Sequence, residues 1–285
     1  MSDLYLRQFR LTITPESGTG KSWTGLRCKF DITKTSDDIP NNGKITIYNL
    51  NDDSRSLLKD VEKKPKCKFE VGYSGKEENF NIDSILKTIL LGDVIKVTDS
   101  YKRPDRNTTI EIGDGQKALA ESKSNEGYKK GTPIKTIVID QLKKLGVDLG
   151  EYVQQQVTDI MKSDSTAGYY SATGMTKDVL MVILKKYGKS FSIQNNEVIL
   201  DPEIHSQEAQ VLSYGTGLLE EPVKNSDGSI SFKALINTDV YPGATIEFQT
   251  EKTTGQYAVD NVSFTGDTRG NEWYMMGETV ADEQQ

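Results

Sequence analysis

The sequence contains one histidine, His205, and two cysteines, Cys28 and Cys67. A structural zinc site needs four cysteine or histidine ligands, and three residues do not complete one. Serine and cysteine nucleophiles usually need a histidine base, and zinc enzymes usually need histidine ligands. Most such chemistry would therefore depend on His205, which lies in the polar segment 201–206 and is expected to be a solvated loop residue.

Two cysteines are too few for a disulfide framework. Each lies in a run in which apolar and polar residues alternate, the pattern of a half-buried strand. We therefore expect two buried thiols that pack as small hydrophobic side chains. The two runs are Leu26, Cys28, Phe30 and Ile32, and Cys67, Phe69, Val71 and Tyr73.

Long apolar segments are also missing. No run approaches the roughly 20 apolar residues of a membrane helix, so we expect no stable membrane insertion. Residues 1–5 lack the basic and then apolar pattern of a secretory signal. With 35 Lys and Arg against 42 Asp and Glu, the net charge is −7, which argues against a general nucleic-acid binder. The 285 residues are 35% hydrophobic and 27% charged, which is typical of a folded chain of two or three domains.

The N-terminal 115 residues show the short alternating runs and the turns of β structure. These runs predict a small barrel or sandwich. One short helix is expected at 54–60, where residues 51–54 supply the cap and Leu57 and Leu58 point inward. The expected strands cover 4–13, 25–33, 44–50, 66–73, 85–98 and 107–112.

The middle of the chain shows helical spacing of apolar residues and predicts a small α/β insert. Beyond it, the chain from Gln210 onward returns to alternating β runs. The order along the chain is therefore β, then α/β, then β. The insert is expected to contain helices at 132–146, from 148 or 151 to 161, and at 176–188 with Thr176 as the N-cap, and a hairpin at 190–200 with its turn at 194–197.

A glycine- and serine-rich segment at 17–22, SGTGKS, is similar to part of a phosphate-binding loop. The full motif places a glycine five residues before Gly20, where this chain has Pro15. The motif also needs a helix directly after its Lys-Ser pair, whereas residues 23–28 lead into a strand pattern. We therefore expect a hairpin loop here, and no nucleotide site.

Paired acidic residues occur at four places, and glycosidases need two carboxylates that face each other across a sugar. Neighbouring residues on a strand point to opposite faces, so a doublet does not supply that geometry. We expect these doublets to be solvated charges, and we expect Asp52-Asp53 to cap a helix. No catalytic, cofactor-binding or metal-binding residue is assigned, and no cofactor is expected. The doublets are Asp37-Asp38, Asp52-Asp53, Glu77-Glu78 and Glu220-Glu221.

Aromatic residues offer two candidate contact points. Tyr169 and Tyr170 follow a glycine, and Trp273 and Tyr274 lie in the last expected strand. Either pair could stack on a sugar or a base, but packing in a core or an interface is the commoner role of such residues.

A set of ordered phrases runs through nearly the whole chain. They are KITIYNL at 44–50, CKFEVGY at 67–73, LGDV at 91–94, RPDRNTT at 103–109, IGDG at 112–115, the segment 174–187, FSI at 191–193, GLL at 217–219, Pro222, ALIN at 234–237, YPG at 241–243 and the segment 266–274. In this order and spacing, the phrases resemble those of the central hub proteins of phage baseplates. Family members often carry His-x-Gly-Asp near the end, where this chain has Phe264 in place of the histidine, and no family chemistry depends on that residue.

The resemblance implies a mainly β fold with an α/β insert, in which two tube-like β-barrel domains, 1–115 and 209–285, flank a small α/β middle domain, 116–208. It also implies a non-enzymatic structural protein of a contractile or related phage tail. In such a tail, a homotrimer forms the baseplate hub and adapts the six-fold tail tube to the three-fold spike around a central channel.

The partners that the resemblance implies are the tail tube protein, the spike protein, the tape-measure protein and the baseplate wedge proteins. DNA only passes through the channel, and a negative lining would repel its phosphates. Such a hub is assembled in the cytoplasm of the host bacterium and ends in the virion.

Three alternatives stay open at this point. A tail-associated cell-wall hydrolase would use Asp and Glu residues as acid and base. A carbohydrate-binding tail module would use Tyr169, Tyr170 or Trp273. A distal tail or tube-completion protein would assemble as a hexamer and not as a trimer.

Overall fold

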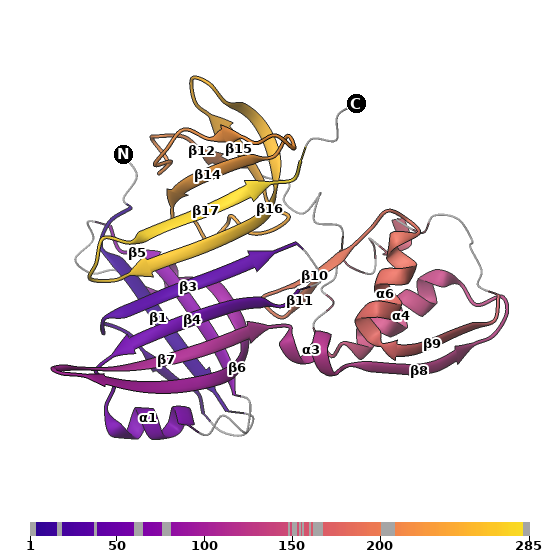
Figure 1. Cartoon of the computed structure of the whole chain (residues 1–285), viewed down its shortest axis with the longest axis horizontal. Coiled ribbons are helices and arrows are strands. Elements are labelled where there is room, and N and C mark those ends of the chain that lie inside the picture. Colours follow the sequence, from indigo (N-terminus) through magenta and orange to yellow (C-terminus); the bar gives the residue numbers. More distant parts are fainter. Residues whose placement is uncertain are drawn as a thin grey trace.

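The computed structural model describes residues 4–15, 19–36, 39–59, 65–75, 81–147, 149, 153, 155, 157–159, 161, 168–200 and 209–281. Within these residues the fold is mainly β (Figure 1). Thirteen strands form one large sheet, and two small two-stranded sheets lie with helices in an insert. The predicted fold class, mainly β with an α/β insert, is therefore confirmed.

The N-terminal β part contains strands β1 to β7 and two short helices. The bounds are β1 (Arg7–Thr14), β2 (Lys21–Trp23), β3 (Cys28–Thr35), β4 (Asn41–Tyr48), α1 (Asp52–Lys59), β5 (Lys66–Tyr73), α2 (Ile82–Ile85), β6 (Lys87–Lys102) and β7 (Asp105–Asp114). Antiparallel pairing gives the order β3-β4-β7-β6-β5-β1-β2. Buried and more exposed residues alternate along β1, β3 and β4, so one face of each strand contributes to a common core.

The helix α1 begins two residues earlier than the sequence predicts. Its cap is Asn51, whose side chain accepts a hydrogen bond of 2.9 Å from the backbone N–H of Ser54. Leu58 is buried, as predicted, but Leu57 is exposed. The expectation that both leucines point inward was wrong, because consecutive helical residues point about 100° apart and α1 buries one narrow face.

The insert lies beside the β parts and has a hydrophobic core of its own. Its elements are α3 (Gln116–Glu121), β8 (Lys123–Tyr128), α4 (Ile134–Lys144), β9 (Tyr170–Met175), α6 (Thr176–Lys185), β10 (Phe191–Gln194) and β11 (Glu197–Leu200). The helix predicted at 148–161 lies partly outside the described residues, but Val153, Val157 and Met161 are buried in this core.

Two details of the insert differ from the prediction. The antiparallel pair β8–β9 was not predicted. The N-cap of α6 is Met175, and Thr176 lies inside the helix, where its hydroxyl group bonds to those of Ser122 and Ser124. The predicted hairpin at 190–200 is confirmed, with both turn residues, Asn195 and Asn196, at positive φ as a tight two-residue turn requires.

The C-terminal β part contains β12 (Gln210–Leu212), β13 (Val223–Lys224), β14 (Ile230–Leu235), β15 (Thr245–Gln249), β16 (Thr254–Asp267) and β17 (Trp273–Thr279). The long strand β16 has two sets of neighbours. Its first residues pair with β15, and its later residues lie between β17 and β3. The pairing of β16 with β3 joins the two β parts into one sheet, which Figure 1 shows as the unbroken series from β14 to β6.

The hydrophobic core of the two β parts is also continuous, with buried residues from β1 to β17 in a single cluster. The predicted boundary after residue 115 falls between β7 and α3. Residues 201–208, before the other boundary, lie outside the described residues. The division into domains 1–115, 116–208 and 209–285 stays a prediction.

Candidate functional site

The two cysteines are buried free thiols, as predicted. Burial raises the pKa of both Cys28 and Cys67, so neither is a thiolate near neutral pH. Neither thiol is therefore suited to act as a nucleophile or a metal ligand. His205, the only histidine of the sequence, lies outside the described residues.

The lysine of the glycine-rich segment lies in a strand. Lys21 begins β2, and its ammonium group lies 5.7 Å from the ring centre of Trp23. The hydroxyl group of Ser22 is hydrogen-bonded to that of Thr12 on the neighbouring strand, at 2.8 Å. A strand in place of a helix after the Lys-Ser pair leaves no helix N-terminus for a phosphate, so the geometry is that of a hairpin.

The acidic doublets within the described residues are engaged in local contacts. Residues 52–53 form the first turn of α1. Glu220 pairs with Lys233 at 2.7 Å, and Glu221 accepts hydrogen bonds from Tyr214 and Thr250. The doublets at 37–38 and 77–78 lie outside the described residues. Among the residues that the structure describes, no group of three or more His, Cys, Asp and Glu could hold a metal ion, and no helix is long and apolar enough to cross a membrane.

The aromatic candidates separate into a buried and an exposed pair. Trp273 is 1% exposed and lies in the core, where a sugar cannot stack on it. Tyr274 lies beneath the ammonium group of Lys233, 5.0 Å from its ring centre. Tyr170 packs near the core of the insert, whereas Tyr169 is 87% exposed.

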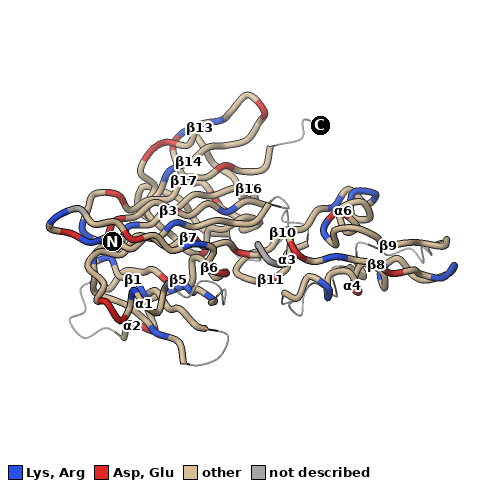
Figure 2. The backbone as a smooth tube through the Cα atoms, turned by 60° about the horizontal axis from the view of Figure 1, so that its bottom comes forward, with Lys and Arg blue, Asp and Glu red and all other residues tan. Residues whose placement is uncertain are grey.

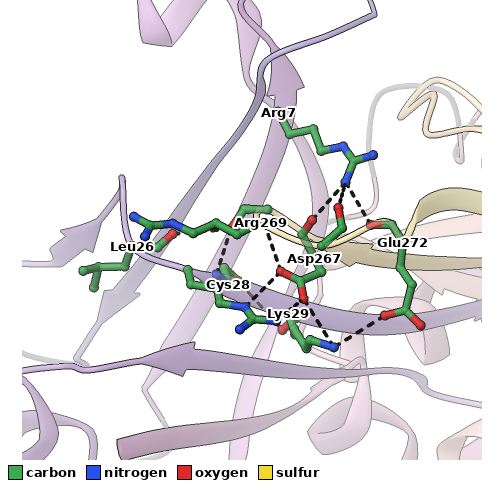
Figure 3. A network of polar contacts seen from close by, with 10 residues as sticks. Arg7, Leu26, Cys28, Lys29, Asp267, Arg269 and Glu272 are labelled. Carbon is green, nitrogen blue, oxygen red and sulfur yellow. Dashed lines mark hydrogen bonds and ion pairs between the residues drawn. The ribbon is translucent and has the colours of Figure 1, made fainter. Parts of the chain in front are cut away.

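A network of polar contacts lies at the seam between the two β parts, where β3 pairs with β16 (Figure 3). The register runs from Thr35 opposite Asn261 to Lys29 opposite Asp267. At its end, the buried carboxylate of Asp267 faces cations from the N-terminal part. The seam therefore places charged groups from opposite ends of the chain in direct contact.

Asp267 accepts hydrogen bonds from Arg27 at two points, Nε to Oδ1 at 3.2 Å and Nη2 to Oδ2 at 2.7 Å. Lys29 Nζ lies 3.3 Å from Oδ2, and the backbone N–H of Arg269 donates to Oδ1. Burial by itself raises the pKa of Asp267, but the hydrogen bonds from Arg27, Arg269 and Lys29 outweigh burial and lower it to about 2. The carboxylate is therefore ionised at neutral pH.

Arg7 holds the turn between β16 and β17 from the other side. Its Nη1 donates to the backbone carbonyl oxygens of Asp267 at 3.1 Å and Gly270 at 2.7 Å. Its guanidinium carbon lies 5.4 Å from the ring centre of Trp273, a cation–π distance. A residue of the first strand thus fixes the turn between the last two strands.

Aromatic packing continues the seam into the core. Trp273 packs edge to face against Phe30 at 5.3 Å and against Tyr73 at 6.2 Å, and Phe30 packs against Phe69 at 5.0 Å. The hydroxyl group of Tyr73 donates to the backbone carbonyl of Ile236 at 3.0 Å. These rings come from β3, β5 and β17, so burial of one requires both β parts to be folded.

The insert is joined to the N-terminal part through a second buried polar cluster. The turn of the β10–β11 hairpin lies on β7, and the carboxylate of Asp114 accepts hydrogen bonds from the backbone N–H groups of Asn195 and Asn196. The side chain of Asn41 donates to the backbone carbonyl of Ile193 at 2.8 Å. These contacts fix the hairpin at the start of β4 and the end of β7.

This second cluster contains a buried cation and a buried anion. The ammonium group of Lys34 is 2.9 Å from Oδ1 of Asn195, and Lys34 is 2% exposed. Burial lowers the pKa of Lys34 to about 8, and the charge of Asp114 opposes this change. Burial also raises the pKa of Asp114, which Lys34 and the hydrogen bonds around it counteract. Each charge therefore favours the ionised form of the other.

No protein-family model and no curated protein sequence matches this chain. Its fold is nevertheless similar to solved tail proteins over almost its whole length. The 43 kDa tail protein of prophage MuSo2 from Shewanella oneidensis has 9% identity and a TM-score of 0.63, covering 96% of this chain and 98% of that one. The tail protein from Neisseria meningitidis MC58 has 8% identity and a TM-score of 0.61, covering 96% and 97%.

A third similar structure is the E. coli c3393 protein, described as a component of the type VI secretion system with structural similarity to the T4 bacteriophage tail proteins gp27 and gp5. It has 12% identity and a TM-score of 0.60, covering 96% of this chain and 77% of that one. These similarities establish that the chain has the fold of phage tail proteins. The resemblance to phage tail proteins is thereby confirmed at the level of the fold.

The seam residues Arg7, Arg27 and Asp267 are not recognisable as partners from the sequence. Asp267 enters the resemblance only as part of the segment 266–274. Nothing local marks the pairing, because Arg27 and Asp267 are 240 residues apart. An arginine and an aspartate at the ends of two alternating runs are only a weak sign of an ion pair. An alignment of homologues in which the two positions co-vary would be a stronger one.

Proposed function

We propose that the chain is a structural component of a phage-type tail, in which a homotrimer forms the baseplate hub. The observation that supports this proposal most strongly is the whole-chain similarity of fold to two tail proteins, one of them from a prophage, and to a protein described as similar to gp27 and gp5. In the hub, three copies surround a channel and join the six-fold tail tube to the three-fold spike.

The arrangement of the two β parts supports such an adaptor. They share one sheet and one hydrophobic core, so each copy presents two β parts in a fixed relation. Three copies then offer six β parts to a six-fold neighbour, while the complete chains keep three-fold symmetry toward the other neighbour. The seam around Asp267 holds the two parts together in each copy.

The contacts of the candidate reactive groups support a non-enzymatic role. The thiols of Cys28 and Cys67 are buried, the doublet 220–221 is engaged in local contacts, and Trp273 packs in the core. We therefore propose contacts with proteins as the function: the tail tube, spike, tape-measure and baseplate wedge proteins. DNA would only pass through the channel, and the assembly would form in the host cytoplasm and end in the virion.

Mass measurement tests the proposal. Light scattering of the purified chain at micromolar concentration is expected to give three times the monomer mass of 31.7 kDa, alone or with the spike protein. The trimer should bind tail tube protein at one end and spike protein at the other. A hexamer would favour a distal tail or tube-completion protein. A strict monomer that binds neither partner would contradict the hub.

A further inference from the structure

The charges of the chain are unevenly distributed. Residues 209–285 contain four Lys and Arg against twelve Asp and Glu, whereas residues 1–115 contain nineteen against eighteen. The negative net charge thus resides in the C-terminal part, and Figure 2 shows acidic positions around β13 and β14. Two surfaces of opposite electrostatic potential attract each other, and the attraction sets their relative orientation. An acidic surface therefore indicates a basic partner.

The acidic surface contains a hollow, which lies on the outer face of β14, β16 and β17, beside β13. Its volume is about 460 Å³. Its apolar lining includes Val223 and Met276, which are 60% and 42% exposed. The lining also contains three carboxylates and one cation: Glu220, Glu221, Glu278 and Lys233.

The single cation is already paired, because Lys233 Nζ lies 2.7 Å from Glu220. Glu278 is exposed and, within the described part of the chain, accepts hydrogen bonds from neutral groups alone, the hydroxyl of Ser231 and the amide of Asn261. Among the described residues, no cation forms an ion pair with Glu278. The hollow is therefore suited to a partner that carries both an apolar or aromatic side chain and a cation.

The hairpin between β6 and β7 carries both kinds of side chain. It projects beyond the edge of the neighbouring strands in Figure 1. Near its tip, Tyr101 is 64% exposed, although tyrosines usually bury most of their ring. Arg103 is also exposed and forms no ion pair with the residues that the structure describes.

We propose that the tip of the β6–β7 hairpin of one copy binds in the hollow on the C-terminal part of the next copy. Tyr101 would pack on Val223 and Met276, and Arg103 would pair with Glu278. This inference rests on the proposed trimer and names one of its contacts. Because hairpin and hollow are different surfaces, the contact is head to tail, the type that closes into a ring when the rotation allows it.

A disulfide cross-link tests the contact directly. The variant Tyr101→Cys with Val223→Cys should form covalently linked oligomers under mild oxidation, seen on a non-reducing gel. The matched control, Tyr101→Cys with Val182→Cys, places the second thiol on α6 at a valine that is 56% exposed. The native Cys28 and Cys67 are buried and should not react. Absence of linked oligomers, or equal linkage in the control, would overturn the contact.

Charge exchange gives an independent measurement. Arg103→Glu and Glu278→Lys are each expected to raise the trimer dissociation constant at least about tenfold, and the double variant should restore it. Lys135→Glu, an exposed change on α4, should leave it unchanged. Circular dichroism would verify that each variant is folded.

The outcomes separate this contact from the hub. A wild-type trimer that none of the charge variants weakens would overturn the hairpin contact and leave the hub proposal standing. A wild type that stays monomeric and binds neither tube nor spike would contradict both.

Discussion

Arg27 and Asp267 form a two-point ion pair across the seam, with Nη2 of the arginine 2.7 Å from Oδ2 of the aspartate. The two residues are 240 positions apart in the sequence. Arg7, which donates to the backbone carbonyl of Asp267, and Trp273, on whose ring the Arg7 guanidinium lies, likewise come from the first and the last strands of the described chain. The pair can therefore form only when both β parts are folded, and its removal reports on the seam.

Asp267→Asn should lower the free energy of unfolding by about 2 kcal/mol, since hydrogen bonds to charged groups contribute roughly 1.5–3 kcal/mol each. Urea unfolding followed by fluorescence measures the change. The control is Glu272→Gln, which removes a half-exposed carboxylate 3.6 Å from Lys29 and should change the stability by less than about 0.5 kcal/mol. Equal effects of both variants would show that the contacts of Asp267 contribute no more to the free energy of unfolding than an exposed ion pair does.

The same carboxylate predicts a pH dependence. The folded-state pKa of Asp267, about 2, is below the ordinary value of about 3.9. Its contribution is therefore fully present above about pH 4 and is lost as the pH falls through about 2. The stability difference between wild type and Asp267→Asn should shrink between pH 4 and pH 2 in urea titrations. A difference that stays constant over this range would contradict the assigned contacts.

Gly266 tests the close packing at the seam. A Cβ atom at this position would lie 2.3 Å from the ring of Phe30, well inside contact distance. Gly266→Ala should therefore destabilise the fold by about 1–3 kcal/mol through overpacking. Gly127→Ala is the control, because nothing lies within 4 Å of its Cβ position. Thermal melts of both variants measure the effect, and a neutral Gly266→Ala would refute the packing.

The attachment of the insert gives another prediction. Asp114→Ala leaves Lys34 buried without its counter-charge and should cost about 3–5 kcal/mol. Hydrogen exchange at the N–H groups of Asn195 and Asn196 should accelerate, because these groups lose their acceptor. Asp31→Ala, an exposed change on β3, should leave their exchange as it is. Unchanged protection in Asp114→Ala would show that the hairpin is held by other contacts.

Much of the fold follows from local pattern. The strand at 66–73 has its predicted bounds, and the hairpin turn at 195–196 follows from two adjacent asparagines that tolerate positive φ. The order of β, α/β and β segments also agrees with the structure. These features depend on neighbours in sequence, which alternation and turn chemistry reveal.

The features that the sequence did not reveal depend on distant neighbours. The pair β8–β9 joins strands that are more than 40 residues apart, and its members KSNEGY and YSATGM lack a run of apolar residues. Thr176 has the residue type of an N-cap, but its hydroxyl group serves a buried cluster with Ser124. The pairing of β3 with β16 leaves no local sign, although it unites the two β parts.

That pairing has a mechanical consequence. The ladder from Thr35–Asn261 to Lys29–Asp267 contains seven opposed residue pairs in antiparallel strands. A force directed along these strands loads all the inter-strand hydrogen bonds at the same time, in shear. They must therefore rupture together and cannot break one after another. The molecule should therefore resist extension along β16 far better than a pull that opens the sheet from its edge.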